Sequence, residues 1–161
     1  MEGTSSLAFR AVFHEANACS LRPVIPFPVD NPRRLRIHVL FTEMRETLAA
    51  LRSAAALSSG MPAELALLVP LTVPYPLPLD APPVPLEFAC RRIGELVAEV
   101  TMEIEAYVYL CRDPYLTIAD ALSPHSLVVI GTSRRWLFNK SKRMARKLRR
   151  QGHDVVLTNY K

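Results

Sequence analysis

The chain has 161 residues, half of them hydrophobic and 22% charged, a composition typical of one globular domain. The longest apolar stretch, residues 65–79, contains four prolines and is shorter than the ~20 residues that a membrane-spanning helix needs. The N-terminus has no charged segment followed by an apolar one, so we expect neither a signal peptide nor a membrane span. Three cysteines without a CxxC pair argue against a disulfide framework or a zinc site, and for a reducing, cytoplasmic compartment.

The net charge of +5 comes from one segment. Residues 134–150 hold nine Lys or Arg and no acid, while the rest of the chain holds 11 basic and 15 acidic residues. A basic helix over 139–151 could bind nucleic acid by neutralising phosphates. Few aromatic residues accompany these charges and no groove-reading motif is present, so we expect a solvated helix face instead.

The N-terminal part of the chain is irregular. Residues 7–13 alternate weakly between apolar and polar positions, as a strand does, and prolines at 23, 26, 28 and 32 then remove backbone donors. We expect residues 1–34 to be an extension, partly disordered or packed on the domain or on a partner chain. The regular domain then covers residues 35–161.

Strands and helices alternate from residue 35 onward. Thr42 is predicted to cap the first helix, which Gly60 ends, and Asp113 followed by Pro114 is a strong helix start. Residues 70–85 hold seven prolines, so we expect an extended loop there and not a strand. The expected strands are 35–41, 63–69, 103–110, 127–130 and 154–159, and the expected helices are 43–58, 86–101, 114–122 and 139–151.

This alternation predicts an α/β fold with a five-stranded, mostly parallel sheet, strand order 3-2-1-4-5, and helices on both faces. In that order, a switch point lies between the first and fourth strands, so the loops after Phe41 and Ile130 meet there. Ligands of open α/β sheets bind in such a crevice.

The segment 126–135 supports a ligand site at this crevice, because an apolar strand ends at a glycine and hydroxyl and basic residues follow at once. Guanidinium and hydroxyl groups near the helix start at 139–141 are suitable partners for a small anion. The alternative is a solvated loop whose arginines pair with acids. The predicted ligand-binding residues, for a nucleotide or an anion, are Thr42, Glu43, Val69, Gly131, Thr132, Ser133, Arg134, Arg135, Asn139, Lys140 and Ser141.

Three segments together carry a resemblance to a known family: RIHVLFTE at 36–43, PYLTIADA at 114–121 and LVVIGT at 127–132. Residues 35–159 resemble the universal stress protein family. Through PLPLD at 76–80 and GTSRR at 131–135, they look closest to the stress-protein-like domains attached to amino-acid permeases and potassium-sensing kinases.

The resemblance implies a member that does not bind ATP. ATP-binding members of the family carry Gly-x2-Gly-x9-Gly-Ser/Thr after the fourth strand, where glycines let backbone amides approach the phosphates. Only Gly131 matches here, because Arg134 and Met144 stand at the other two glycine positions. Binders also carry an aspartate after the first strand, near the place of Glu43. We therefore expect no cofactor.

The sequence has no recognisable catalytic constellation, so we expect a binding module without catalytic activity. The resemblance implies a regulatory, homodimeric protein of a stress or transport-linked response that pairs through strand 154–159. One alternative is a nucleotide- or phosphate-binding protein that uses the Gly131 loop. A second alternative is nucleic-acid contact through the basic helix 139–151.

Overall fold

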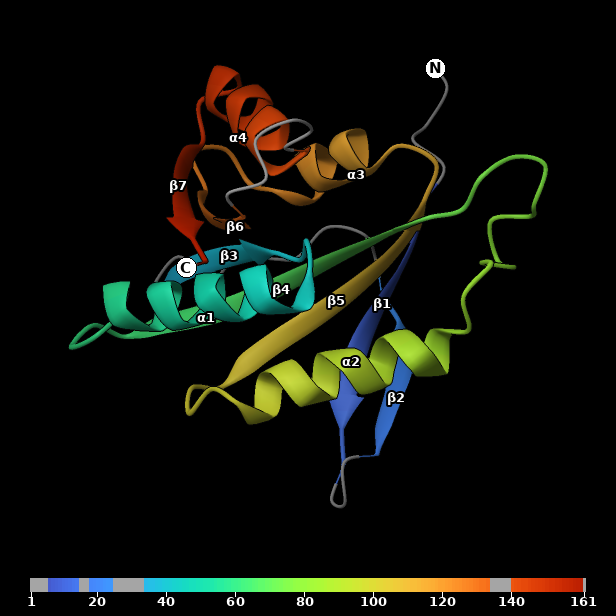
Figure 1. Ribbon diagram of the computed structural model, residues 1–161, viewed down its shortest axis with the longest axis horizontal. Coiled ribbons are helices and arrows are strands. Elements are labelled where there is room, and N and C mark those ends of the chain that lie inside the picture. The colour runs from blue at the N-terminus through green and yellow to red at the C-terminus, as the bar shows by residue number, and fades with distance from the viewer. Residues whose placement is uncertain (1–5, 15–17, 25–33, 134–139, 161) are drawn as a thin grey trace.

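The computed structural model describes residues 6–14, 18–24, 34–133 and 140–160. These residues form one sheet with helices on its two faces (Figure 1). The strands are β1 Ser6–Phe13, β2 Cys19–Pro23, β3 Leu35–Leu40, β4 Ala63–Thr72, β5 Ile104–Cys111, β6 Leu127–Thr132 and β7 Asp154–Asn159. The helices are α1 Met44–Leu57, α2 Leu86–Ala98, α3 Pro114–Ala121 and α4 Lys140–Arg150.

The sheet has seven strands in the order β2-β1-β5-β4-β3-β6-β7, and it is mixed. The prediction of a five-stranded, mostly parallel sheet is therefore wrong. The five strands β5, β4, β3, β6 and β7 run parallel to one another. In contrast, β1 pairs antiparallel with β5, and β2 pairs antiparallel with β1. The difference arises because the N-terminal hairpin covers the edge that β5 would otherwise expose, and a covered edge is protected from unwanted pairing.

Two apolar layers lie on opposite faces of the sheet. On one face, α1 and α2 bury side chains such as Leu51 and Ile93 against β3, β4 and β5. On the other face, α3 and α4 bury side chains such as Ile118 and Leu148 against β4, β5, β6 and β7. Figure 1 shows the α1–α2 pair and the α3–α4 pair on these two sides. The core therefore fixes α4 beside the last strand of the sheet.

The helix ends show which local signals decided the boundaries. The carboxylate of Asp113 accepts a hydrogen bond from the Leu116 amide at 3.1 Å, as a capping residue should, so this predicted helix start is confirmed. The predicted cap at Thr42 is wrong by one residue, because Glu43 is the N-cap of α1 and its side chain makes no capping bond. Gly60, just after α1, has a φ of +81° that favours glycine.

Strand β4 continues through Pro70 to Thr72, so the prediction that 70–85 contains no strand is wrong for its first three residues. The Phe41 amide donates to the Leu68 carbonyl, so the backbone groups of Leu68 point toward β3. Backbone direction repeats every two residues in a strand, so the nitrogen of Pro70 points toward the same edge. β3 ends at Leu40, so no strand needs the amide that proline lacks. Pairing with β5 continues through Thr72.

Cys19 of β2 and Cys90 of α2 form a disulfide, with their Cα atoms 5.8 Å apart. The prediction against a disulfide is wrong for this pair. The two cysteines are 71 residues apart in sequence, but the β1–β2 hairpin extends the sheet beyond β5, and α2 packs over β2, which brings them together. Cys111 is a buried free thiol. The argument from cysteine usage for a reducing compartment therefore no longer holds.

No helix in the described part of the chain is long and apolar enough to cross a membrane. The N-terminal strands belong to the same sheet as residues 35–159.

Candidate anion-binding site

Helix α4 carries seven basic residues and no acid among its eleven residues. Ser141, Ala145 and Leu148 are buried, and they mark the face that packs on the sheet. The exposed basic residues fall into two groups, those that line a hollow beside the helix and those that do not. We call Lys142, Arg146, Arg149 and Arg150 the groove row, and Lys140, Arg143 and Lys147 the outer row.

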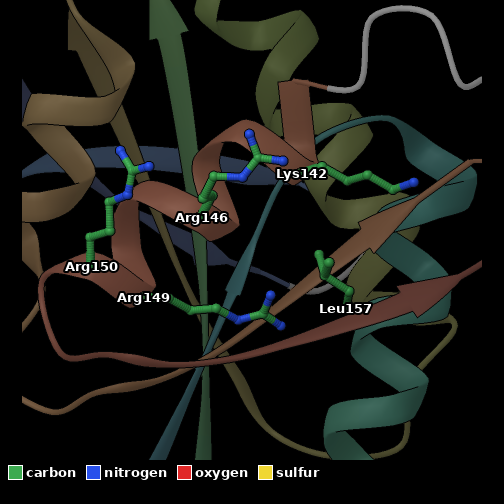
Figure 2. Close-up of a pocket in the computed structure, with 5 residues that line it drawn as sticks. All are labelled: Lys142, Arg146, Arg149, Arg150 and Leu157. Atoms are coloured by element: carbon green, nitrogen blue, oxygen red, sulfur yellow. The ribbon is translucent and has the colours of Figure 1, made fainter.

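The groove row lines an open hollow of about 450 Å³ between α4 and β7 (Figure 2). The fifth lining residue is Leu157, which comes from β7 and packs partly against the core under α4. Figure 2 shows all four basic side chains leaving α4, with Leu157 across from them on the strand. We call this hollow the α4–β7 groove. The described part of its lining consists of four basic side chains and one aliphatic side chain.

Contacts on both sides hold α4 in place. On the groove side, Nη2 of Arg149 donates a hydrogen bond to the carbonyl of Val155 in β7 at 2.8 Å. On the other side, Nζ of Lys147 lies 4.7 Å from the centre of the Tyr115 ring of α3, within the range of a cation–π contact. The basic side chains therefore start from a backbone that is anchored to β7 and to α3.

The electrostatics of the groove favour an anion. Among the described residues, Arg146 and Arg150 form no ion pair with an acid, and both are exposed. The described salt bridges with acids lie elsewhere in the molecule, for example between Arg36 and Glu105 at 2.7 Å. A cleft lined by charges of one sign raises the local concentration of counter-ions, and guanidinium groups bind carboxylates and phosphates in a bidentate manner.

The crevice expected from the sequence is organised differently. A Cβ placed on Gly131 would overlap the backbone carbonyl of Glu46, in the first turn of α1. The glycine is therefore required because a helix backbone crosses β6 at this point, and this reason needs no phosphate. Thr132 is buried, and its hydroxyl donates to Oδ1 of Asn159 at 2.7 Å, so β7 already uses it.

The other expected site residues around the crevice are spread between surface and core. The Thr42 amide donates to Oγ1 of Thr47 at 3.0 Å, and the Thr42 hydroxyl is buried without a hydrogen-bond partner among the described residues. Glu43 is exposed, whereas Val69 of β4 is buried in the core and pairs with Val108 of β5. Ser133 is half-buried just after β6.

At the start of α4, Lys140 is exposed and Ser141 is buried. Arg134, Arg135 and Asn139 lie outside the described residues. The structure thus places the ends of β3 and β6 side by side, with Leu40 opposite Ile130, but the first turn of α1 lies over Gly131.

Sequence reasoning missed the groove row as a site, although it identified the basic helix. The missed signal is the spacing of Lys142, Arg146, Arg149 and Arg150 at i, i+4, i+7 and i+8, which places all four on one side of a helix that lacks acids. A homodimer through strand 154–159 stays a prediction. No protein-family model matches this chain, and no curated protein matches it.

Proposed function

We propose that this protein is a non-catalytic binding module whose ligand carries several negative charges and binds in the α4–β7 groove. The observation that supports the proposal is that four basic side chains of one helix line one open hollow, with no acid among its described lining residues. The regulatory role within a stress or transport-linked response rests on the sequence resemblance of residues 35–159 to universal stress proteins.

The groove offers more to an anion than the Gly131 loop does, as far as both are described. At Gly131 the first turn of α1 occupies the space above the strand, and the nearby Thr132 hydroxyl already has a partner. In the groove, Arg146 and Arg150 present exposed guanidinium groups with no competing acid among the described residues. We therefore favour the groove over the nucleotide-binding alternative.

The number of cations suggests a multiply charged ligand. A singly charged ion would offset only one of the two positive charges at Arg146 and Arg150, and charges of one sign raise each other's energy. Each hydrogen bond to an ionised group is worth roughly 1.5–3 kcal/mol, so several phosphate or carboxylate groups on one ligand would add usefully to affinity.

The experiment is a calorimetric titration of the protein with tripolyphosphate at constant ionic strength. The test variant is Arg146→Gln/Arg150→Gln in the groove row. The matched control is Lys140→Gln/Arg143→Gln in the outer row, which removes the same charge from the same helix. We expect the groove variant to bind at least about tenfold more weakly, and the control to change by less than about threefold.

Equal weakening in both variants would mean that the net charge of α4, and not the groove, attracts the anion. That result, or no binding by the wild type, would contradict the proposal.

A further inference from the structure

One edge of β7 has backbone groups that no other described strand uses. The amides of Asp154 and Tyr160 donate to Ser126 and Thr132 on the β6 side, both at 3.0 Å. Backbone groups along a strand point alternately to its two edges, and residues of one parity therefore bond to β6. Residues of the other parity, Val155, Leu157 and Asn159, direct their amides and carbonyls to the opposite edge.

That opposite edge is open in the described part of the chain. The strand order ends at β7, so no described strand pairs there. One of its carbonyls is covered, because Arg149 donates to the oxygen of Val155. The backbone groups of Leu157 and Asn159 are left as donors and acceptors, and Leu157 also lines the α4–β7 groove. An unpaired edge and a basic groove therefore lie side by side.

We propose that the ligand of the groove is an acidic peptide segment that adds to the free edge of β7 as an extra strand. This inference rests on the proposed function and specifies the ligand's chemistry. The peptide backbone bonds to Leu157 and Asn159, and acidic side chains at alternate positions face α4. Main-chain bonds supply affinity in such strand addition, while alternate side chains supply specificity.

The spacings of the two elements agree with this arrangement. Side chains two residues apart in a strand lie on one face, about 6.5 Å apart along the strand. Arg146 and Arg150 are four residues apart on α4, and that separation advances about 6 Å along a helix. A helix that connects two parallel strands runs back along the sheet, so two alternate acids of the peptide can each meet one arginine.

Two other occupants fit the observations less well. A second copy paired through β7 would bring two groove rows toward each other, and like charges brought together across an interface are costly. A nucleic acid would gain little from stacking on the described residues that line the groove, because none of them is aromatic, and it would leave the edge carbonyls without donors.

The test uses fluorescence anisotropy with three labelled nine-residue peptides in which Glu alternates with Val. One peptide is unmodified, one is N-methylated at every Glu, and one is N-methylated at every Val. All three carry the same charge. In a strand, all Glu amides face one edge and all Val amides face the other. We therefore expect exactly one methylated peptide to lose affinity, by about tenfold or more, because it loses the bonds to β7.

Equal affinity of all three peptides would overturn strand addition, and so would equal loss in both methylated forms. If tripolyphosphate binding depends on Arg146 and Arg150 but the peptides fail in this way, the proposed anion site stands and only this inference falls. If tripolyphosphate also fails, the proposed function falls as well.

Two protein variants locate the binding edge. Leu157→Pro removes an amide of the free edge, while Leu157→Ala shortens the side chain and keeps that amide. We expect the unmodified peptide to bind the Pro variant about fivefold or more weakly than the Ala variant. Equal affinities would overturn the contact with β7.

Two further outcomes would assign the edge or the groove to another partner and overturn the proposal. One is a single-stranded oligonucleotide that binds more tightly than the peptide and depends on Arg146 and Arg150. The other is a two-chain mass in light scattering that saturating peptide leaves unchanged.

Discussion

Gly131 of β6 lies so close beneath Glu46 of α1 that a Cβ on the glycine would overlap the Glu46 backbone carbonyl. The contact couples the first turn of a helix to the end of a strand far from it in sequence. It also gives the single glycine of the VVIGT segment a structural role that differs from phosphate binding.

We predict that Gly131→Ala destabilises the protein by at least about 1–3 kcal/mol, because the added carbon meets backbone that can move only with the whole helix turn. The matched control is Gly94→Ala in α2, where the nearest atom to an added Cβ is Cε1 of Phe13 at 3.8 Å. There alanine should stabilise by up to about 1 kcal/mol, since it favours helix. Urea denaturation of both variants checks the prediction, and equal effects would contradict it.

The disulfide between Cys19 and Cys90 gives a prediction that requires no variant. Denatured, unreduced protein should present one reactive thiol, from Cys111, and reduced protein should present three. Reduction should also lower the free energy of unfolding by about 2–4 kcal/mol, because the bond constrains the unfolded chain. A Cys19→Ser/Cys90→Ser variant serves as the control and should not respond to reductant. Three thiols before reduction would show that the bond does not form in solution.

His153 should make stability depend on pH. Its Nδ1 accepts a hydrogen bond from the Ser126 amide at 3.2 Å, so the ring is neutral in the folded protein. Burial, and then the neighbouring His125, lower the pKa of His153 below its usual value of about 6.5, although Asp154 opposes them. The unfolded chain therefore takes up a proton first as the pH falls, and the stabilisation is complete above about 6.5 and is lost below it.

The measurement is the free energy of unfolding from pH 8 to pH 5 for wild type and His153→Asn. Titrating groups that do not interact with His153 cancel in the difference between the two proteins. The stability advantage of the wild type should shrink as the pH falls through about 6.5. A difference that is constant across this range would rule out His153 as the titrating group.

Proline substitutions should distinguish the two edges of β7. The amide of Val156 has the parity that bonds to β6, so Val156→Pro should cost clearly more stability than Val156→Ala. The amide of Leu157 faces the free edge, so Leu157→Pro should lower the stability of the protein about as much as Leu157→Ala does. Thermal unfolding of the four variants checks this prediction. If proline destabilised the protein beyond alanine by the same amount at both positions, the assignment of edges would be wrong.

Local signals predicted much of the element order. Asp113 followed by Pro114 predicted α3, and the apolar run before Gly131 predicted β6. Both predictions were possible because a helix cap and a buried strand each leave a pattern within a few neighbouring residues. Boundaries were less secure. The extension of β4 through Pro70 depended on where β3 ends, and the proline itself carries no information about that.

The errors in the sheet and in the disulfide have one origin. The pairing of β1 with β5 joins residues as far apart as Ser6 and Cys111, and the side chains of Arg10 and Glu105 form an ion pair at 3.4 Å across the two strands. The Cys19–Cys90 bond likewise joins β2 to α2. Neither long-range partner is encoded in local periodicity. The same limit applies to the site, because the basic helix was visible but its packing beside Leu157 was not.

The Cys19–Cys90 bond has a mechanical consequence. It closes a covalent ring that contains β3, α1 and β4, and its two anchor points are 71 positions apart in sequence. If the two ends of the chain were pulled apart, the tension would bypass this ring and pass through the sulfur atoms. At about 3.4 Å per extended residue, roughly 240 Å of contour length would stay hidden until a reductant cut the bond. A stretched molecule would thus lengthen by markedly different amounts with and without reductant.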